Sequence, residues 1–316
     1  MVSFQKNTVA DIYHGSHRVK EVWHGTEFVY GYEGWFPDPV LPNDPHLNGV
    51  RIKVVVNETN PEDRKVFFTG SFYRARITSI DFGDGTSTTT IPEYHQYENG
   101  EYWLVIEGYI EEIRGGDNVQ PSGLILANPL VSSNPATDGQ YYFFENRLLT
   151  ELYIGDDVGL QKLDNGAFTG WAAMTKLRLP NTLEEIGPAS FEACTAIEVI
   201  DLRNCVNLRR VQEYSFDSLT NLRKVILPEN LYLISYTFNY CDNLETVVFL
   251  LDDFVQYNDK HIGEVPGVYY WYLSFMDCSE DMTLYVRRGK TDLYDYYQQE
   301  LYPAFKEVKE TNRSLF

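Results

Sequence analysis

The 316-residue sequence has few cysteines, few basic residues and no long apolar run. Four cysteines in a chain of this length argue against a disulfide-stabilised scaffold. The 26 Lys and Arg residues stand against 46 Asp and Glu, a net charge of −20, which disfavours binding to nucleic acid or to an anionic membrane. The longest apolar run covers residues 247–251, far short of the ~20 residues that span a bilayer. We therefore expect neither nucleic-acid binding nor membrane insertion.

The sequence also lacks the motifs of common catalytic sites. We find no Gly-rich phosphate loop, no G-x-S-x-G, no H-E-x-x-H and no C-x-x-C. No apolar stretch interrupts the charged first 20 residues, so we expect no secretory leader there. These gaps favour a protein that is not an enzyme and needs no cofactor. The 46 acidic residues leave a glycan-degrading carboxylate pair open as a third alternative.

With 43% apolar and 15% aromatic residues the chain can bury a core, and its patterning predicts a mainly β protein in blocks. We assign a β-hairpin anchoring segment to residues 1–35 and a Pro-rich linker to residues 36–47. A β-sandwich follows at 48–115, a connector at 116–147 and a repeat solenoid at 148–316.

The first block contains a short internal repeat. Aromatic-His-Gly occurs at residues 13–15 and again ten positions later at residues 23–25, with β-branched or aromatic residues on either side. This spacing predicts short strands joined by Gly-containing turns. His14, His17 and His24 are possible metal ligands, but no Cys or placed carboxylate completes a site, so we expect no metal. The segment resembles hairpin repeats of tailed-bacteriophage virion proteins, which implies an anchor to other virion proteins.

The second block alternates apolar and polar residues, as half-buried strands do, at residues 50–56 and 77–82. The elements I-D-F-G-D-G at 80–85, H-x-Y at 95–97 and G-x-Y-x-L-x-I at 100–106 occur in order. Together they resemble a polycystic-kidney-disease-type (PKD) domain, which implies an immunoglobulin-like spacer. Asp81 and Asp84 either bind Ca²⁺ or, as we favour, organise the tight turn.

The third block repeats every 22 to 25 residues. Phe168, Phe191, Phe216 and Phe238 mark the period, and Phe275 follows after an insertion at 250–272. A second column, three residues after each phenylalanine, holds Trp171, Cys194, Leu219, Cys241 and Cys278. Such columns in phase predict leucine-rich-repeat coils that stack into one core, with the cysteines as small buried hydrophobes.

The sequence of residues 183–197, L-E-E-I-G-x-x-S-F-x-x-C-T-x-I, resembles BspA-like leucine-rich repeats. That resemblance covers about 148–310 and implies an adhesive surface protein. Residues 283–308 are similar to the family's terminating strand, helix and strand, which implies a C-terminal capping helix at 293–297.

Two sets of residues are candidates for binding. The middle residue of each L-x-L strand should face solvent, which gives a concave row of Tyr153, Arg178, Asp201, Ile226, Val248 and Tyr285. The insertion adds a cluster of aromatic residues, Phe254, Tyr257, Tyr269, Tyr270, Trp271 and Tyr272. Either set could instead pack against the protein itself.

The blocks together favour a phage virion protein, such as a tail or fibre appendage assembled in the host cytoplasm. The solenoid would contact a host surface protein or glycan, and the particle would hold a homo-oligomer. The alternative is a bacterial cell-surface or secreted adhesin.

Overall fold

The structure is a computed structural model, and its larger unit is mainly β. It describes residues 12–14, 17–19, 21–24, 27–31, 48–69, 72–113, 125–127, 148–228, 231, 233–234, 236–249, 275–286, 291 and 305–311. The chain divides into two compact units, Met1–Asn43 with Thr311–Phe316, and Asp44–Glu310. Among the described residues, no helix is both long and apolar enough to cross a membrane.

The smaller unit contains two antiparallel hairpins. β1 (Ile12–His14) pairs with β2 (His17–Val19), and β3 (Glu21–His24) pairs with β4 (Glu27–Gly31). His14 thus ends β1, and His24 ends β3. The side chains of His14, His17 and His24 lie outside what the structure describes.

The larger unit begins with strands of the second block. β5 (Val50–Val56) buries every second residue, which is the alternation that the sequence predicts. β5 pairs with the long strand β10 (Gly100–Ile113), which pairs in turn with β7 (Phe72–Asp81), and β7 pairs with β8 (Ser87–Thr88). A second sheet orders β11 (Ile125–Ala127), β6 (Lys65–Thr69) and β9 (Tyr94–Gln96), and a 3₁₀ helix, η1 (Pro61–Arg64), precedes β6. Phe68 packs edge-on against Phe82 across these elements, with ring centroids 5.9 Å apart.

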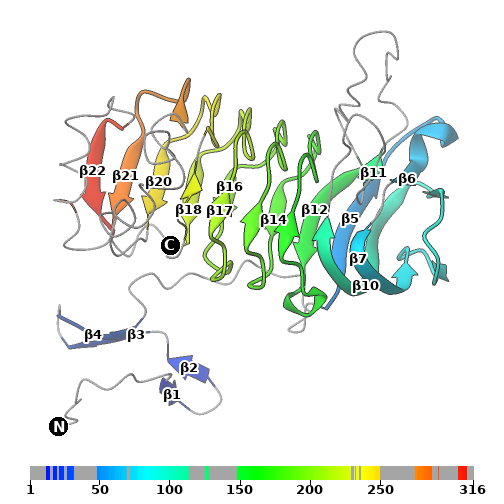
Figure 1. The fold of residues 1–316 in the computed structure, drawn as a ribbon, viewed down its shortest axis with the longest axis horizontal. Coiled ribbons are helices and arrows are strands. Elements are labelled where there is room, and N and C mark those ends of the chain that lie inside the picture. Colours follow the sequence, from blue (N-terminus) through cyan, green and yellow to red (C-terminus); the bar gives the residue numbers. More distant parts are fainter. Residues whose placement is uncertain are drawn as a thin grey trace. The chain divides into compact units, whose positions relative to one another are not determined.

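The third block is a solenoid whose strands form two parallel rows. One row holds β12 (Leu149–Ile154), β14 (Lys176–Arg178), β16 (Val199–Asp201), β18 (Lys224–Leu227), β20 (Thr246–Phe249), β21 (Thr283–Val286) and β22 (Glu307–Glu310). The other holds β13 (Lys162–Leu163), β15 (Glu185–Ile186), β17 (Arg210–Val211) and β19 (Leu233–Ile234). A 3₁₀ helix, η2 (Asp156–Val158), follows β12. Figure 1 shows the strands of this block side by side, from β12 in green to β22 in red.

The second block and the solenoid share one sheet. Its strand order is β14-β12-β5-β10-β13-β15-β17-β19, so β5 adjoins the first strand of one row and β10 the first strand of the other. The buried side chains form a single hydrophobic cluster that runs from Val50 to Phe305. The β5–β10 pair therefore closes the first coil of the solenoid, and covers an apolar end that a repeat stack would otherwise expose.

Several expectations fall outside the described residues. They are the 36–47 linker, the 250–272 insertion with its six aromatic residues, and the capping helix at 293–297. Of the 116–147 connector the structure describes β11, which pairs with β6 of the second block. The strands that flank the expected helix, β21 and β22, are described and pair in parallel.

Candidate binding surfaces

The repeat phenylalanines form a stacked ladder, as the sequence predicts. From Phe168 through Phe191, Phe216 and Phe238 to Phe275, successive ring centroids lie 5.3, 5.2, 5.2 and 5.5 Å apart. Trp171 meets the first ring edge-on at 5.0 Å, and Phe305 meets the last edge-on at 5.2 Å. The spacing continues from Phe238 to Phe275 although 37 residues separate them in the sequence. The insertion therefore leaves the stacking of the coils intact.

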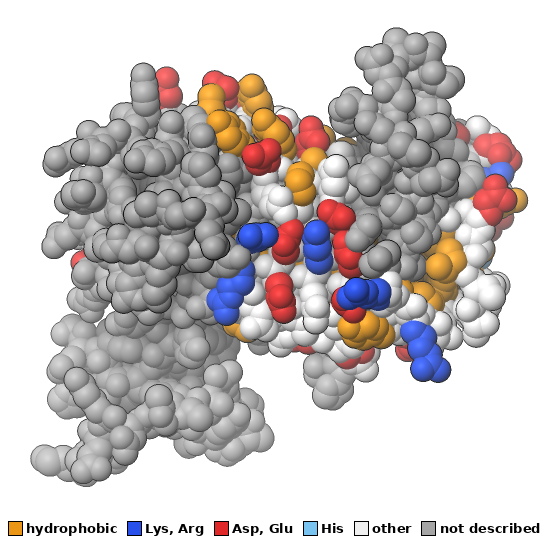
Figure 2. Space-filling view, viewed as in Figure 1, with side chains coloured by type: hydrophobic (Ala, Val, Ile, Leu, Met, Phe, Trp, Pro, Cys, Tyr) orange, Lys and Arg blue, Asp and Glu red, His pale blue; other side chains and the backbone are white. Residues whose placement is uncertain are grey.

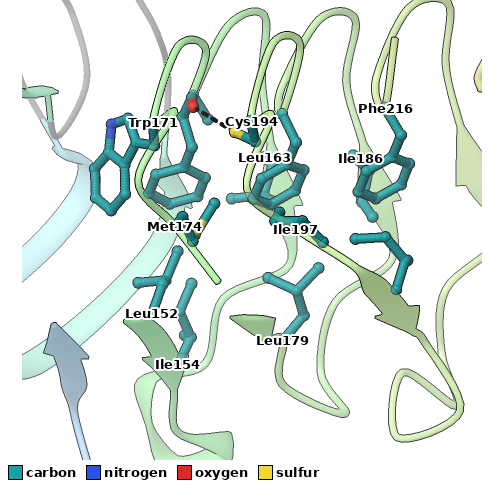
Figure 3. Close-up of a cluster of buried hydrophobic side chains, with 14 of the residues drawn as sticks. Leu152, Ile154, Leu163, Trp171, Met174, Leu179, Ile186, Cys194, Ile197 and Phe216 are labelled. Atoms are coloured by element: carbon teal, nitrogen blue, oxygen red, sulfur yellow. Dashed lines mark hydrogen bonds between the residues drawn. The ribbon is translucent and has the colours of Figure 1, made fainter. Parts of the chain in front are cut away.

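The second column adds thiol hydrogen bonds between coils. Cys194 Sγ donates to the Phe168 carbonyl of the preceding coil at 3.3 Å, and Figure 3 shows this bond beside Trp171 and Met174. Cys241 and Cys278 repeat the contact to Phe216 and Phe238 at 3.5 and 2.9 Å. Burial raises the pKa of the Cys194 thiol far above its ordinary value, so the donor proton stays in place. These cysteines act as small core residues that also satisfy a backbone carbonyl.

Other polar side chains join one coil to the next. The Ser190 and Ser215 hydroxyls both donate to the Gly187 carbonyl, at 2.8 and 2.9 Å. Asparagine amides donate to carbonyls of the preceding coil at 2.6 to 2.8 Å: Asn207 to Asn181, Asn221 to Thr195 and Asn243 to Thr220. Carbonyls that no β ladder reaches thereby gain hydrogen-bond partners.

Each ladder phenylalanine is flanked by left-handed backbone. The residues two before and two after it have positive φ: Gly166 and Gly170, Ala189 and Ala193, Tyr214 and Ser218, Tyr236 and Tyr240, and then Asp277. Only the first coil places glycine at these positions, where a side chain costs about 1 kcal/mol or more. Tyr214 and Tyr240 are nevertheless 45% and 53% exposed.

The residues of the predicted concave row lie opposite one another on neighbouring strands, but several of them are buried. Tyr153 lies opposite Arg178, and Asp201, Ile226, Val248 and Tyr285 follow one another across β16, β18, β20 and β21. Lys309 of β22 extends the row, which the sequence analysis missed. Tyr153, Ile226 and Val248 are at most 2% exposed, so the expectation that they face solvent is wrong.

The reason is that β18 and β20 are covered on both faces. Each buries three consecutive residues after its first, Val225–Leu227 and Val247–Phe249, which is the pattern of a fully buried strand rather than an alternating one. The continuous apolar runs V-I-L and V-V-F were the available signal. The Tyr153 ring instead packs 5.9 Å from the Trp103 ring, and its hydroxyl donates to Glu151 at 2.7 Å.

The polar residues of the concave row, Arg178 and Asp201, form hydrogen bonds and ion pairs within the solenoid. Arg178 donates to the Ile154 carbonyl at 2.8 Å and pairs with Asp156 at 3.3 Å. Asp201 accepts from the Arg203 guanidinium through both carboxylate oxygens. The Tyr285 side chain, on β21, is partly exposed.

Ion pairs run across both rows of strands. On one, Glu101, Lys53, Glu151 and Lys176 are linked at 2.9, 3.8 and 3.5 Å, so the series crosses from the second block into the solenoid. On the other, Lys162 and Arg210 flank Glu185 at 3.5 and 3.8 Å. Figure 2 shows basic and acidic side chains interspersed over β5, β12 and β14. These faces are charged but locally neutralised.

One carboxylate in the turns is buried without full compensation. Asp217 is 6% exposed; its Oδ2 accepts from the Ser218 hydroxyl at 2.7 Å, and its Oδ1 has no partner among the described residues. Burial raises the pKa of Asp217, and this effect is larger than the lowering by the Ser218 hydrogen bond. Burial, and then the charge of Asp217, raise the pKa of Glu192 in the neighbouring coil. The charged forms of both groups are thus disfavoured here.

The acidic turn of the second block is built around its own hydrogen bonds. Asp81 accepts from the Gly83 amide at 2.9 Å, and Asp84 accepts from the Thr86 amide at 2.9 Å and from its hydroxyl at 2.6 Å. The second Asp84 oxygen lies 2.7 Å from His95 Nε2. Burial opposes ionisation of Asp84, but these bonds outweigh it and keep its pKa below the ordinary value. Both carboxylates organise the turn. No cluster of three metal-ligating side chains occurs among the described residues.

The stacked coils, the parallel rows and the ladder define a leucine-rich-repeat solenoid. Residues 138–257 match the family described as the BspA type leucine-rich repeat region, in six copies. The coils of Phe275 and Phe305 lie beyond the matched stretch yet continue its ladder. No curated protein and no solved structure matches the chain.

Proposed function

We propose that the protein is a non-enzymatic binding protein of adhesive type, whose solenoid presents a fixed surface to a protein partner. The observation that carries this proposal is the single core from Val50 to Phe305. Because every coil is tied to its neighbours by ring stacking and by polar bridges, exposed side chains on different coils keep a fixed spacing. A pre-ordered surface loses little conformational freedom on binding, which favours affinity.

At the next level of detail we propose a phage virion component. The 1–35 segment would attach to other virion proteins. It belongs to a compact unit of its own, Met1–Asn43 with Thr311–Phe316, which supports such a role. The 48–115 block would be a PKD-type sandwich. Since its β5–β10 pair continues into the solenoid sheet, it would carry the solenoid as one body rather than as a loose spacer. The assembled form would be a homo-oligomer within the particle.

Mass spectrometry of purified virions from the source community tests the location. The proposal expects peptides of this chain to co-purify with capsid and tail proteins through density-gradient centrifugation. If the peptides instead follow the bacterial envelope fraction, the chain is a cell-surface adhesin, which the BspA-type repeats also support. Detection only among free secreted proteins contradicts the virion proposal as well.

A binding assay on the solenoid tests the adhesive role separately. The full chain, fluorescently labelled, should bind host cells in a saturable way that excess unlabelled protein competes. A parallel glycan-hydrolysis screen should show no turnover. Turnover that an Asp or Glu substitution abolishes would overturn the non-enzymatic proposal.

A further inference from the structure

The turns that carry the phenylalanine ladder differ in charge from the rest of the solenoid. We define the phenylalanine turns as residues 164–173, 187–196, 212–221, 236–243 and 275–281. They contain eight acidic residues and no Lys, Arg or His: Asp164, Glu192, Glu213, Asp217, Asp242, Asp277, Glu280 and Asp281. The basic residues of the coils lie instead on the strands and the segments beside them, where several pair with acids. Lysines outside the turns pair with two of these acids, Lys162 with Asp164 and Lys306 with Asp281. Burial disfavours the charged forms of Glu192 and Asp217. The turns still expose four acids, Glu213, Asp242, Asp277 and Glu280, so this edge of the solenoid carries a net negative charge.

The same edge exposes a group of tyrosines. Tyr214 and Tyr240 are 45% and 53% exposed, and Tyr236 lies between them in the chain with its ring centroid 6.1 Å from that of Tyr214. Met276, on the next coil, is 43% exposed, and its carbonyl accepts from the Tyr240 amide at 3.0 Å. Figure 2 shows apolar and acidic side chains, with no basic ones, along the upper edge of the described solenoid.

The backbone indicates that these rings are not there for the stability of the turns. All three tyrosines occupy left-handed positions, with φ of 59°, 47° and 56°. The first coil places Gly166 and Gly170 at the equivalent positions, so the fold itself accepts glycine there. Tyr214 and Tyr240 also expose their rings to solvent, whereas Tyr236 is half-buried. A bulky residue held in this strained region often marks a functional site.

From this combination we propose that the tyrosine edge, Tyr214, Tyr236 and Tyr240 with the acids of the phenylalanine turns, binds a Lys- or Arg-rich segment of a partner protein. A cation over a tyrosine face gains from the ring quadrupole, and the surrounding carboxylates attract it over a longer range. The internal cations that reach the turns, Lys162 and Lys306, pair with Asp164 and Asp281, which lie in other coils than the three tyrosines. An anionic partner would meet repulsion at this edge. The inference rests on the proposed binding role, but it does not depend on the virion.

The test measures binding of a fluorescein-labelled decalysine peptide to the full chain by fluorescence anisotropy. The double variant Tyr214→Gly/Tyr240→Gly removes two rings while keeping backbone positions that glycine favours, so the solenoid should fold at least as well as wild type. We expect decalysine to bind the variant about four- to 25-fold more weakly, from about two- to fivefold for each ring. Tyr94→Ala, which removes a 43% exposed tyrosine on β9, is the matched control and should leave the affinity unchanged.

Variants that neutralise acidic side chains test the contribution of charge in the same assay. Glu213→Gln/Asp242→Asn should weaken decalysine binding, whereas Glu198→Gln, an exposed acid outside the turns, should have little effect. Binding should also fall as salt is raised. Equal affinity of wild type and the tyrosine variant, or an equal loss in Tyr94→Ala, overturns the proposal. Tighter binding of a neutral oligosaccharide than of decalysine, lost in the tyrosine variant, overturns it in favour of a glycan partner. The absence of the chain from virions would leave every arm of this assay unchanged.

Discussion

Asp217 should lower the free energy of unfolding of the solenoid at neutral pH, and Asp217→Asn should restore it. The side chain is buried with Oδ1 unpartnered among the described residues, and burial raises its pKa. An unsatisfied buried polar atom costs about 1–3 kcal/mol. The next coil carries Asn239 at the equivalent position, and its Oδ1 accepts from the Met276 amide at 3.2 Å. An amide therefore suits this site, and we expect Asp217→Asn to raise the free energy of unfolding by about 1 kcal/mol at pH 7.

The sign of the pH dependence follows from the raised pKa. Asp217 is neutral in the folded protein below the pKa of an unfolded Asp, about 3.9, and the stability it contributes is lost as pH rises through the folded pKa. The gain from Asp217→Asn should thus be largest at pH 7 and vanish near pH 3.5, in urea unfolding followed by circular dichroism. Glu198→Gln, at an exposed site, is the control and should change stability by less than about 0.5 kcal/mol. A loss of stability at pH 7, or a gain that does not vary with pH, would refute this reasoning.

Three further predictions concern the backbone and the thiols. Ala193→Gly should raise the unfolding free energy by about 1 kcal/mol, because Ala193 has φ of 58° where the first coil has Gly170; an unchanged denaturation midpoint would contradict it. Native protein treated with Ellman's reagent should release colour mainly from the half-buried Cys278, and denaturation should expose the other three thiols; prompt reaction of all four would contradict the core packing. Gly108→Ala should lower the melting temperature and cost at least about 2 kcal/mol, since the new Cβ would lie 2.2 Å from the Arg76 carbonyl oxygen; a neutral effect would show that the bulge in β10 relaxes.

The repeat architecture was predictable because its information is local and periodic. A phenylalanine every 22 to 25 residues, with a small or apolar residue three positions later, can be buried in every coil only if the coils stack. The alternation in residues 50–56 likewise predicted a half-buried strand, and β5 shows it. These patterns specify which side chains lie inside, and the core follows from them.

The accessible surface was less predictable, because it depends on contacts between distant segments. Period two predicts that the middle residue of a strand faces away from the core, but it does not reveal whether something covers that face. Ile226 and Val248 are middle residues of this kind, yet both are buried because the face that they occupy is covered as well. The pairing of β5 with β12 joins residues about 100 positions apart, and no local pattern encodes it. The left-handed tyrosines were visible in the sequence only as residues two away from a phenylalanine, a signal that becomes meaningful once the turn geometry is known.

A pair of double-mutant cycles on the phenylalanine ladder tests the central claim most directly. With Phe→Leu substitutions, which keep most of the core volume, Phe191 and Phe216 should show a coupling energy of about 0.5–1.5 kcal/mol, because their rings stack at 5.2 Å. Phe168 and Phe238, which two ring positions separate, should be additive within about 0.5 kcal/mol. A coupling of the same size in both pairs, or none in the first, would contradict a solenoid whose coils are held in order by this ladder.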